Sequence, residues 1–519
     1  MIRASKMTLP LALLLGSACG DDAKVTPVST MDAGESVSVA LAPPTSADAG
    51  LAFTPTWHEH IAPLVHEHCS GCHQPGAIAP FSMLEYGTTK GFAGLMASEV
   101  ESGAMPPYLA TNTADCTPKH KYAEDTRLSD QQKQMLRAWA TAGAPEGDPA
   151  KAAPLPNPPP VALDREDVVM TIPQPIVTQV SDKGDLHTCL VIDPKLDKDV
   201  YITGRQITAG NPKVLHHVVQ YVVKPALADG TATTRADMLD KLRATKGVGI
   251  GERYDCFGGP TLDQTGLAYE MLGAWAPGAL PVTGPDDSGQ PAKRDSLIVL
   301  DMHYHPLASG PETDSTTKLS LRLATSIPKY IAAPVFQGYA SAKQPVHQES
   351  AHGTADLLLQ PGETTPALFI PAGEANHVEE WTYKWKLPVS SLRVYFASTH
   401  MHYVGRDMQV QLINGTPKAG EDPVECLLET PKWDFNWQRG YTWEAKYDQL
   451  PQLDDGDTIK VKCVFDNTLD NKFLAKALDE QGKSAPIDVS VGEDTLNEMC
   501  LATIGIAYPN AAYVPPTTP

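Results

Sequence analysis

Short runs of β-branched and aromatic residues, separated by turn residues, fill the chain from Val161 onward. They alternate with polar residues or cluster, as strand residues do, and helical periodicity is nearly absent from this part of the chain. The pattern predicts a mainly β fold with two consecutive antiparallel, jelly-roll-like β-sandwich domains of similar size, at 165–328 and 329–512. The clearest runs lie at 199–203, 214–223, 297–300, 392–396 and 458–465.

The chain ahead of these runs has a different character. Residues 53–148 have a mostly helical pattern, and their closing helix begins at Ser129, where Gln132 completes a capping box before apolar residues at helical spacing. Residues 149–164 form a stiff proline-rich linker, and residues 20–52 form a flexible tether. We therefore expect a small α-helical domain in front of the two β domains.

Residues 1–19 have the shape of an export signal. A short positive start with Arg3 and Lys6 precedes an apolar run at 7–15, which is too short to span a bilayer. The Ser-Ala-Cys ending resembles a bacterial lipobox, in which Cys19 is lipidated; ordinary cleavage to a soluble secreted form is the alternative. We expect an exported protein on the periplasmic or cell-surface face of a bacterial membrane, attached through a lipid anchor only.

The net charge limits the class of binding partner, and the cysteine content indicates the cellular compartment. The chain of 519 residues carries a formal net charge of −21. That charge argues against a nucleic-acid partner, because phosphate binding needs clustered Lys and Arg. Of the nine cysteines, Cys19 suits a lipid and two lie in a Cys-x-x-Cys-His motif. The remaining six can form up to three disulfides in an oxidising compartment.

The motif Cys69-Ser-Gly-Cys72-His73 predicts a covalently attached haem c. Its two thiols form thioethers and its histidine becomes the proximal iron ligand. We predict Met105 as the sixth ligand, because a thioether opposite a histidine raises the potential. Met83, Met96, His120 and a five-coordinate haem remain alternatives. The nearby His58, His60, His66 and His68 are expected on the exposed side of a helix rather than in a metal cluster.

Five histidines and one methionine form an ordered set along the β part. His216 and His217 are adjacent, and His303 follows in Asp-Met-His-Tyr-His. Adjacent side chains of an ideal strand point to opposite faces, so the first pair can share a metal ion only where the strand twists or bulges. His400 and His402 are two apart and face the same side of a strand.

The last member of the set, Met499, would add a thioether to the second histidine pair. Imidazoles with one methionine suit copper shuttling between Cu(I) and Cu(II) better than zinc. Each pair taken alone is explained equally well as hydrogen-bonded polar groups inside a sandwich. The whole ordered set instead predicts two separate three-ligand copper sites.

These residues resemble the type II copper, ascorbate-dependent monooxygenases, a family that includes dopamine β-hydroxylase and peptidylglycine α-hydroxylating monooxygenase. The resemblance covers roughly residues 165 to 512. The segments that carry it are Val-Leu-His216-His217, Ala274-Trp275-Ala-Pro-Gly, Leu300-Asp-Met-His303-Tyr-His305-Pro, Phe396-Ala-Ser-Thr-His400-Met-His402-Tyr-Val-Gly405-Arg406 and Glu498-Met499-Cys500.

The resemblance implies a role for each histidine set. His216, His217 and His303 would hold an electron-storing copper. The catalytic copper, where O₂ binds and the substrate C–H bond is attacked, would be held by His400, His402 and Met499. His305 lies outside the expected ligand sets.

Two disulfides are also implied by the resemblance, Cys463–Cys500 and Cys189–Cys256. The first would pin the strand that presents Met499. Cys116 and Cys426 are left over, one in the helical domain and one in the second sandwich. We hypothesise a third bridge between them, which would dock the cytochrome domain on the copper core.

Two positions depart from the peptidylglycine enzymes. Those enzymes hold the substrate carboxylate with an arginine two residues before the His-x-His pair and a tyrosine four residues after the methionine. Ser398 and Thr503 occupy these positions here, so peptide amidation is not expected. The Phe-Ala-Ser and Tyr-His-Pro segments are nearer the catecholamine branch, but no residue can be assigned to a substrate amine.

Together these features predict an exported dicopper monooxygenase that hydroxylates a C–H bond of a small organic substrate with O₂. The reaction takes two electrons beyond those of the substrate, and a haem on the same chain would supply them at a high effective concentration. A donor protein or small reductant would reduce the haem. The alternative is a copper- and haem-binding electron-transfer lipoprotein without oxygenase activity, which would couple no O₂ uptake to an organic substrate.

Overall fold

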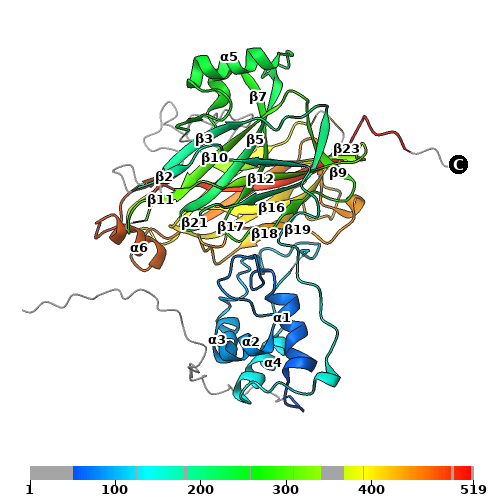
Figure 1. Ribbon diagram of the computed structural model, residues 1–519, viewed down its shortest axis with the longest axis vertical. Helices are drawn as coiled ribbons and strands as arrows, with labels where there is room; N and C mark the ends of the chain where they lie inside the picture. The colour runs from blue at the N-terminus through cyan, green and yellow to red at the C-terminus, as the bar shows by residue number, and fades with distance from the viewer. Residues whose placement is uncertain are drawn as a thin grey trace, which may run out of the picture.

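In Figure 1 a small helical part lies below a larger β part. The computed structural model describes residues 51–515, apart from 124, 180–184, 257–258, 308, 340–367, 388, 390 and 493–495. The expected signal peptide, the lipidation position Cys19 and nearly all of the expected tether lie outside the described residues.

Four α-helices surround a small apolar core in the helical part. Trp57, Ile61, Leu136 and Trp139 are among its most buried side chains. The capping box at Ser129 is confirmed, because its hydroxyl accepts the backbone N–H of the third helical residue while that residue's side chain accepts the Ser129 N–H. The elements are a π-helical turn at Trp57–Ile61, α1 Ala62–His68, α2 Tyr86–Thr89, a 3₁₀ turn at Lys90–Phe92, α3 Ala93–Ser102, α4 Asp130–Thr141 and a 3₁₀ turn at Pro149–Lys151.

A ten-stranded sheet runs through both halves of the β part. Its pairings are antiparallel except where β13 lies parallel to β9, with Tyr330 opposite Ser288. This parallel pair joins the two expected domains in one sheet. In spatial order its strands are β1 Val168–Thr171, β12 Lys318–Leu323, β4 Val200–Thr208, β9 Ser288–Ala292, β13 Tyr330–Tyr339, β23 Cys500–Pro509, β16 Ser391–His400 and β19 Gly440–Thr442, with β8 Val282–Thr283 beside β4 and β20 Gln452–Asp454 beside β16.

A five-stranded antiparallel sheet packs on the first half of the ten-stranded sheet. Leu190, Val218, Leu300 and Leu321 are almost fully buried in the core that the two sheets share. Its opposite face carries α5 and the Cys189–Cys256 disulfide. The elements are β6 Arg253–Tyr254, β3 Leu186–Ile192, β10 Leu297–Tyr304, β5 Leu215–Leu227, β7 Leu267–Trp275, α5 Arg235–Lys246 and a 3₁₀ turn at Leu262–Thr265.

A four-stranded antiparallel sheet packs on the second half. Val394, Val410, Val461 and Ile504 lie in the shared core, and the Cys463–Cys500 disulfide links the two sheets. The elements are β15 His377–Lys384, β21 Thr458–Phe465, β17 Gly405–Ile413, β18 Val424–Thr430, α6 Lys472–Glu480 and a 3₁₀ turn at Tyr447–Gln449, with two small strand pairs, β2 Ile176–Thr178 with β11 Glu312–Asp314 and β14 Phe369–Ile370 with β22 Val489–Ser490.

The expected mainly β fold with antiparallel sheets is confirmed. β-branched and other apolar residues alternate with polar ones along strands such as β21, whose side chains are alternately buried and half-buried. None of the helices among the described residues is long and apolar enough to cross a membrane.

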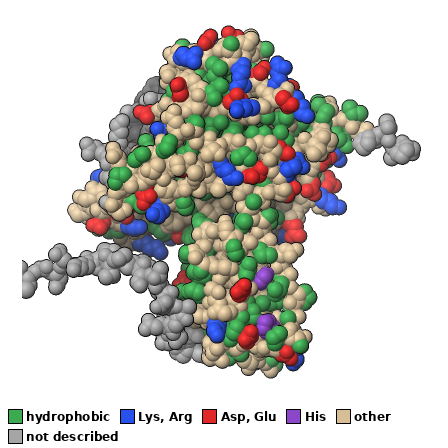
Figure 2. Space-filling view, viewed as in Figure 1, with side chains coloured by type: hydrophobic (Ala, Val, Ile, Leu, Met, Phe, Trp, Pro, Cys, Tyr) green, Lys and Arg blue, Asp and Glu red, His purple; other side chains and the backbone are tan. Residues whose placement is uncertain are grey.

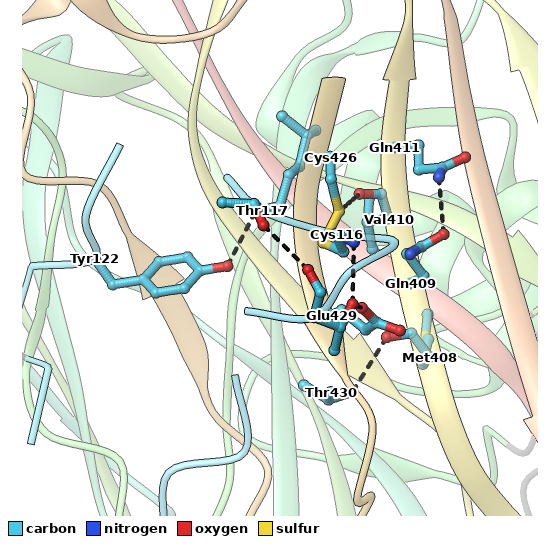
Figure 3. The surroundings of a disulfide bond; sticks show 12 residues. Cys116, Thr117, Tyr122, Met408, Gln409, Val410, Gln411, Cys426, Glu429 and Thr430 are labelled. Atoms are coloured by element: carbon cyan, nitrogen blue, oxygen red, sulfur yellow. Dashed lines mark hydrogen bonds between the residues drawn. A yellow bond between two sulfur atoms is a disulfide. The ribbon is translucent and has the colours of Figure 1, made fainter. Parts of the chain in front are cut away.

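The hypothesised third disulfide is present. Cys116, in the segment after α3, is bonded to Cys426 on β18, and the Cys426 Sγ also faces the Val410 carbonyl (Figure 3). The Tyr122 hydroxyl donates to the Leu427 carbonyl at 3.1 Å. The segment between α3 and α4 is therefore tied to the four-stranded sheet by a covalent bond and a buried hydrogen bond.

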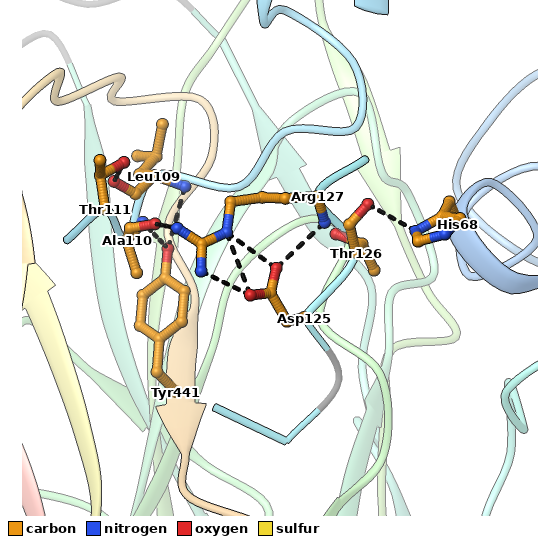
Figure 4. A network of polar contacts seen from close by, with 8 residues as sticks. All are labelled: His68, Leu109, Ala110, Thr111, Asp125, Thr126, Arg127 and Tyr441. Carbon is orange, nitrogen blue, oxygen red and sulfur yellow. Dashed lines mark hydrogen bonds and ion pairs between the residues drawn. The ribbon is translucent and has the colours of Figure 1, made fainter. Parts of the chain in front are cut away.

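A polar network extends this contact (Figure 4). The Arg127 guanidinium bonds the Asp125 carboxylate and the Ala110 carbonyl. The Tyr441 hydroxyl accepts the backbone N–H groups of Leu109 and Ala110, both at 3.2 Å. Because Tyr441 lies on β19, the network joins the segment after α3 to the ten-stranded sheet.

The surface differs between the two parts. In Figure 2, basic and acidic side chains are interspersed over the β part, while the viewed face of the helical part shows mainly apolar and uncharged groups. Interspersed charges of this kind are typical of a solvated surface.

Candidate metal centre

His216 and His217 share one face of β5 because the strand bulges there. On the neighbouring β10, His303 pairs with His217, but the next residue, Tyr304, pairs with Leu215. His216 is thus the extra residue of a β-bulge, which bends the strand and re-aims its side chains. The sequence required a twist or bulge for two adjacent histidines to meet, and the bulge is found.

Three imidazole nitrogens converge at this bulge. His217 Nδ1 lies 3.1 Å from His216 Nδ1 and 3.4 Å from His303 Nδ1. A metal ion with bonds of about 2.0–2.1 Å would hold its nitrogen ligands roughly 3.3–3.6 Å apart. The rings are steeply inclined, with interplanar angles between 59° and 76°. His303 Nδ1 also lies 3.2 Å from His217 Nε2. Spacing and inclination therefore fit one ion shared by the three imidazoles, and these residues are one of the compact potential ligand groups among the described residues.

Burial keeps these imidazoles neutral. Removal from water, followed by the charges of neighbouring histidines, lowers the pKa of His216 and of His217 well below its usual value. Metal binding requires a deprotonated imidazole. The group therefore meets that requirement at neutral pH.

Asp185 fixes the third histidine from behind. Its Oδ2 lies 3.0 Å from His303 Nε2, and its Oδ1 lies 2.7 Å from His305 Nδ1. Burial alone raises the pKa of the Asp185 carboxyl group. The hydrogen bonds from the two histidines outweigh this effect and hold the pKa below its usual value, so the carboxylate stays charged. A carboxylate on the outer nitrogen of a ligating histidine sets its tautomer and orientation. No sequence motif marks Asp185. His305, expected outside the ligand sets, lies against this carboxylate.

His187 on β3 is a fourth histidine in the same row. It lies directly opposite His303 in the sheet, and the two rings stack with centroids 4.2 Å apart at 18°. Asp185, His187 and His303 also have ligand atoms within reach of one another. Stacked rings, however, direct their in-plane nitrogen lone pairs side by side rather than toward a common point. We therefore assign His187 to packing against His303.

His400 and His402 form the second histidine pair at the end of β16. Their ring centroids are 5.2 Å apart, at an interplanar angle of 84°. His400 Nδ1 lies 2.6 Å from Gln438 Oε1, and His402 Nδ1 lies 3.0 Å from the Asn497 carbonyl oxygen. Each ring thus uses Nδ1 as a hydrogen-bond donor, which leaves Nε2 for a metal ion. Burial lowers the pKa of His400 to about 4 and that of His402 to about 3.

Glu498 joins this pair to Met499. Its buried carboxyl group, whose pKa burial raises to about 8, accepts the backbone N–H groups of His402, of Val404 at 3.2 Å and of Met499 at 2.8 Å. Along β23, Leu501 pairs with His400, so Met499, two residues earlier, lies toward the same face. The Met499 side chain is 7% exposed and packs with Leu501. The structure therefore places Met499 beside the histidine pair, and it gives Glu498, which the sequence showed only as part of the Met499 segment, a role in holding the two together.

The two histidine groups touch each other. His217 and His400 have ring centroids 6.1 Å apart. Phe435 stacks on His216 at 4.7 Å and lies 5.9 Å from His402. The sequence predicted two separate sites on successive stretches of chain. Here the folded chain brings both groups to one junction between the sheets.

The Cys-x-x-Cys-His motif forms a tight turn after α1. The His73 N–H donates to the Cys69 carbonyl at 2.9 Å, and Cys69 and Cys72 are both free thiols. His73 Nδ1 lies 3.3 Å from the Phe81 carbonyl oxygen, which leaves Nε2 for iron. Burial, and then the charge of Cys72, raises the pKa of the Cys69 thiol to about 12. Two reduced cysteines and one oriented histidine suit thioether attachment of a haem, and Met105 as the sixth ligand stays a prediction.

Two other histidines of the helical part are not where the sequence placed them. His66 and His68 were expected on an exposed helix face, but they are only 9% and 7% exposed. His66 Nδ1 contacts the Pro156 carbonyl and His68 Nδ1 the Thr126 carbonyl. The expectation of exposure is wrong because the linker and the segment before α4 cover this side of α1.

Comparison with known proteins gives no assignment. No family model matches the chain, and no curated protein matches it. The major capsid protein P2 of bacteriophage PM2 matches 65% of this chain and 99% of its own length, with 8% identity and a TM-score of 0.22. An allantoicase matches 56% and 83%, with 11% identity and a TM-score of 0.13. Such low scores carry no argument about fold or function.

Proposed function

We propose that this chain is an exported dicopper monooxygenase that hydroxylates a C–H bond of a small organic substrate with O₂. The observation that carries the proposal is the convergence of three imidazoles at the His216–His217 bulge, directly beside a second histidine pair whose Nδ1 atoms are already bonded. The two sets differ in the number of histidines and in the hydrogen bonds of their ring nitrogens, so they suit two metal ions with different roles in the reaction. We also propose that the two sheet pairs are the two copper-binding sandwiches.

The ligand types favour copper. His216, His217 and His303 would hold one ion, and His400 and His402 would hold the other with the thioether of Met499. Neutral imidazoles and a soft sulfur ligand fit an ion that alternates between Cu(I) and Cu(II). Bound copper would supply one-electron redox chemistry and oxygen activation.

The protein's own groups would prepare this centre for the reaction. Asp185 holds His303 so that Nδ1 faces the other two imidazoles. Glu498 holds the backbone of His402 against that of Met499. Phe435 covers both groups with an aromatic ring, which would keep water from the space between them.

The helical part would act as a tethered electron donor. Cys69, Cys72 and His73 would hold a haem c, which supplies single electrons when bound, and a donor protein or small reductant would reduce it. Burial raises the pKa of the Cys72 thiol, and the charge of Arg439 lowers it, so this arginine lies near the motif. The preceding residue, Gln438, contacts His400. Arg439, whose charge acts on Cys72, thus follows directly after the residue that contacts the second histidine pair.

The substrate is not expected to be a peptide carboxylate. Ser398 and Thr503, which replace the arginine and tyrosine of the peptidylglycine enzymes, pair directly across β16 and β23. Ser398 lies two residues before His400, toward the same face of the strand. Neither side chain offers a positive charge to a carboxylate.

Export and lipid anchoring belong to the same proposal. Three disulfides are compatible with an oxidising compartment. The anchor would be a lipid on Cys19, facing the periplasm or the cell surface.

The proposal is tested by oxygen incorporation. The copper- and haem-loaded protein is incubated with ¹⁸O₂, a reductant and a panel of small aromatic and aliphatic amines and alcohols, and products are analysed by mass spectrometry. We expect one ¹⁸O atom per product and a loss of at least about 100-fold in Met499→Ile, a size typical of removing a group that acts in the chemical step. The control Met238→Leu, on the buried face of α5, should retain activity. Reversible haem and copper reduction without labelled product would favour the electron-transfer lipoprotein.

A further inference from the structure

A hollow between the two halves of the β part contains an arginine that no acidic group of the described residues neutralises. Arg205 on β4 lines it together with Gln290 on β9 and Tyr395 on β16. The hollow has room for roughly one water molecule. Because its lining strands β4, β9 and β16 belong to the ten-stranded sheet, the hollow lies where strands of both halves meet.

The guanidinium has no counter-charge in the part of the chain that the structure describes. No carboxylate among those residues forms an ion pair with Arg205, and its buried Nε has no hydrogen-bond partner there. The guanidinium stays charged in proteins. The Arg205 side chain is half-buried, and withdrawing its Nε from water without a partner is unfavourable. A small anion would remove this penalty.

Tyr395 is the polar neighbour of this cation but does not neutralise it. The tyrosine is 8% exposed. Burial raises its pKa above the usual range, although the Arg205 charge lowers it, so the phenol stays protonated at neutral pH. A neutral phenol is a hydrogen-bond donor and not a counter-charge. Arginine and tyrosine together therefore present positive charge and an O–H donor.

The backbone is shaped to admit the arginine. A Cβ atom added at Gly273 on β7 would lie 1.8 Å from Arg205 Nε and 2.4 Å from its Cζ. Only glycine permits the guanidinium to lie across the backbone at this point. Two other polar side chains of the lining are already used, since Gln290 Nε2 donates to the Met271 carbonyl and Ser288 Oγ donates to that of Pro285. Arg205 and Tyr395 remain to bind a ligand.

We propose that Arg205 and Tyr395 bind a monatomic anion of the chloride class in this hollow, as a bridge between the two halves of the β part. The size of the hollow favours a halide ion over a carboxylate or phosphate. The anion contacts β4 from one half and β16 from the other, so its binding stabilises their association. This site does not depend on the metal ions of the proposed function.

The test is thermal unfolding of the full chain in sodium chloride and in sodium gluconate at equal ionic strength. We expect chloride to raise Tm by roughly one to a few degrees, with a saturable concentration dependence, because it binds the folded state only. Arg205→Gln should abolish the difference between the two salts. Arg243→Gln, which removes one exposed positive charge on α5, should keep it. Equal Tm in both salts for the wild type, or a chloride effect retained in Arg205→Gln, overturns the proposal.

A second measurement covers the case in which Arg205→Gln does not fold. Crystals of the wild-type protein are grown in sodium bromide, and the anomalous scattering of bromide is mapped. A peak beside the Arg205 guanidinium and the Tyr395 hydroxyl supports the site. An ordered, bromide-free hollow overturns it.

Discussion

His217 on the five-stranded sheet and His400 on the ten-stranded sheet face each other with ring centroids 6.1 Å apart. The contact joins two histidine groups that are distant in sequence. Each group is held by its own buried carboxylate, Asp185 behind His303 and Glu498 beside His402. We therefore expect that loss of either carboxyl group weakens one metal position and spares the other.

Asp185→Asn tests the first of these supports. The amide keeps the shape but loses the charge that orients His303, and loss of such an outer partner costs about 10–100-fold in metal affinity. Copper titration followed by EPR should show one weakened copper and one unchanged copper. Asp199→Asn, which alters an exposed ion pair with Lys293, is the matched control. Equal weakening of both coppers would contradict the assignment.

Glu498 tests the second support. Glu498→Ala leaves three buried backbone N–H groups without an acceptor, and each unsatisfied buried donor costs about 1–3 kcal/mol. We expect unfolding free energy to fall by at least about 2 kcal/mol and the second copper to be lost, with a smaller effect for Glu498→Gln, which keeps one acceptor oxygen. Urea unfolding and metal analysis measure both. Glu480→Gln on α6 should behave like the wild type.

The Cys116–Cys426 bridge makes a prediction about the link between the two parts. If a protease site is placed at the exposed Leu155 in the linker, cleavage should leave the helical part covalently attached to the β part. The two fragments should separate on gels only after reduction. In Cys116→Ser/Cys426→Ser they should separate without reductant, whereas Cys189→Ser/Cys256→Ser should keep them joined. Separation of the cleaved wild type without reductant would disprove the bridge.

Asp407 on β17 gives a pH dependence of stability. Burial, and then the charge of Glu429, raises its pKa to about 6, above the usual value of about 4. The folded state therefore holds a proton that the unfolded chain releases between these pH values. The stabilisation of the folded state by the protonated Asp407 carboxyl is complete below about pH 4 and is lost as the pH rises through about 6.

Urea unfolding from pH 4 to 7 measures this contribution. Asp407→Asn should remove it and leave a flatter profile, and the exposed Asp470→Asn should not. An unchanged profile in Asp407→Asn would show that other groups carry the pH dependence.

The sequence predicted those features that local pattern or resemblance determines. Alternating strands predicted a mainly β fold, and adjacent histidines required a bulge at His216, which is present. The resemblance implied two of the disulfides, and the third followed from the two cysteines that were left. These predictions needed no knowledge of which strands are neighbours.

What the sequence could not predict depends on contacts between distant strands. Asp185 reaches His303 only because β3 pairs with β10. Phe435 lies between the histidine groups only because the five-stranded and the ten-stranded sheets meet at its loop. The parallel pairing of β13 with β9 merges the expected domains in one sheet. Strand patterns indicate which face is buried but do not name the partner strand.

Metal content combined with EPR tests the central claim most directly. The full chain is produced in a periplasmic host with haem maturation and copper, and copper and iron are counted. We expect two coppers per haem with a type II signal, one lost in His217→Ala and the other in His402→Ala. Haem without copper, or a single copper that both variants abolish, would contradict two adjacent copper positions.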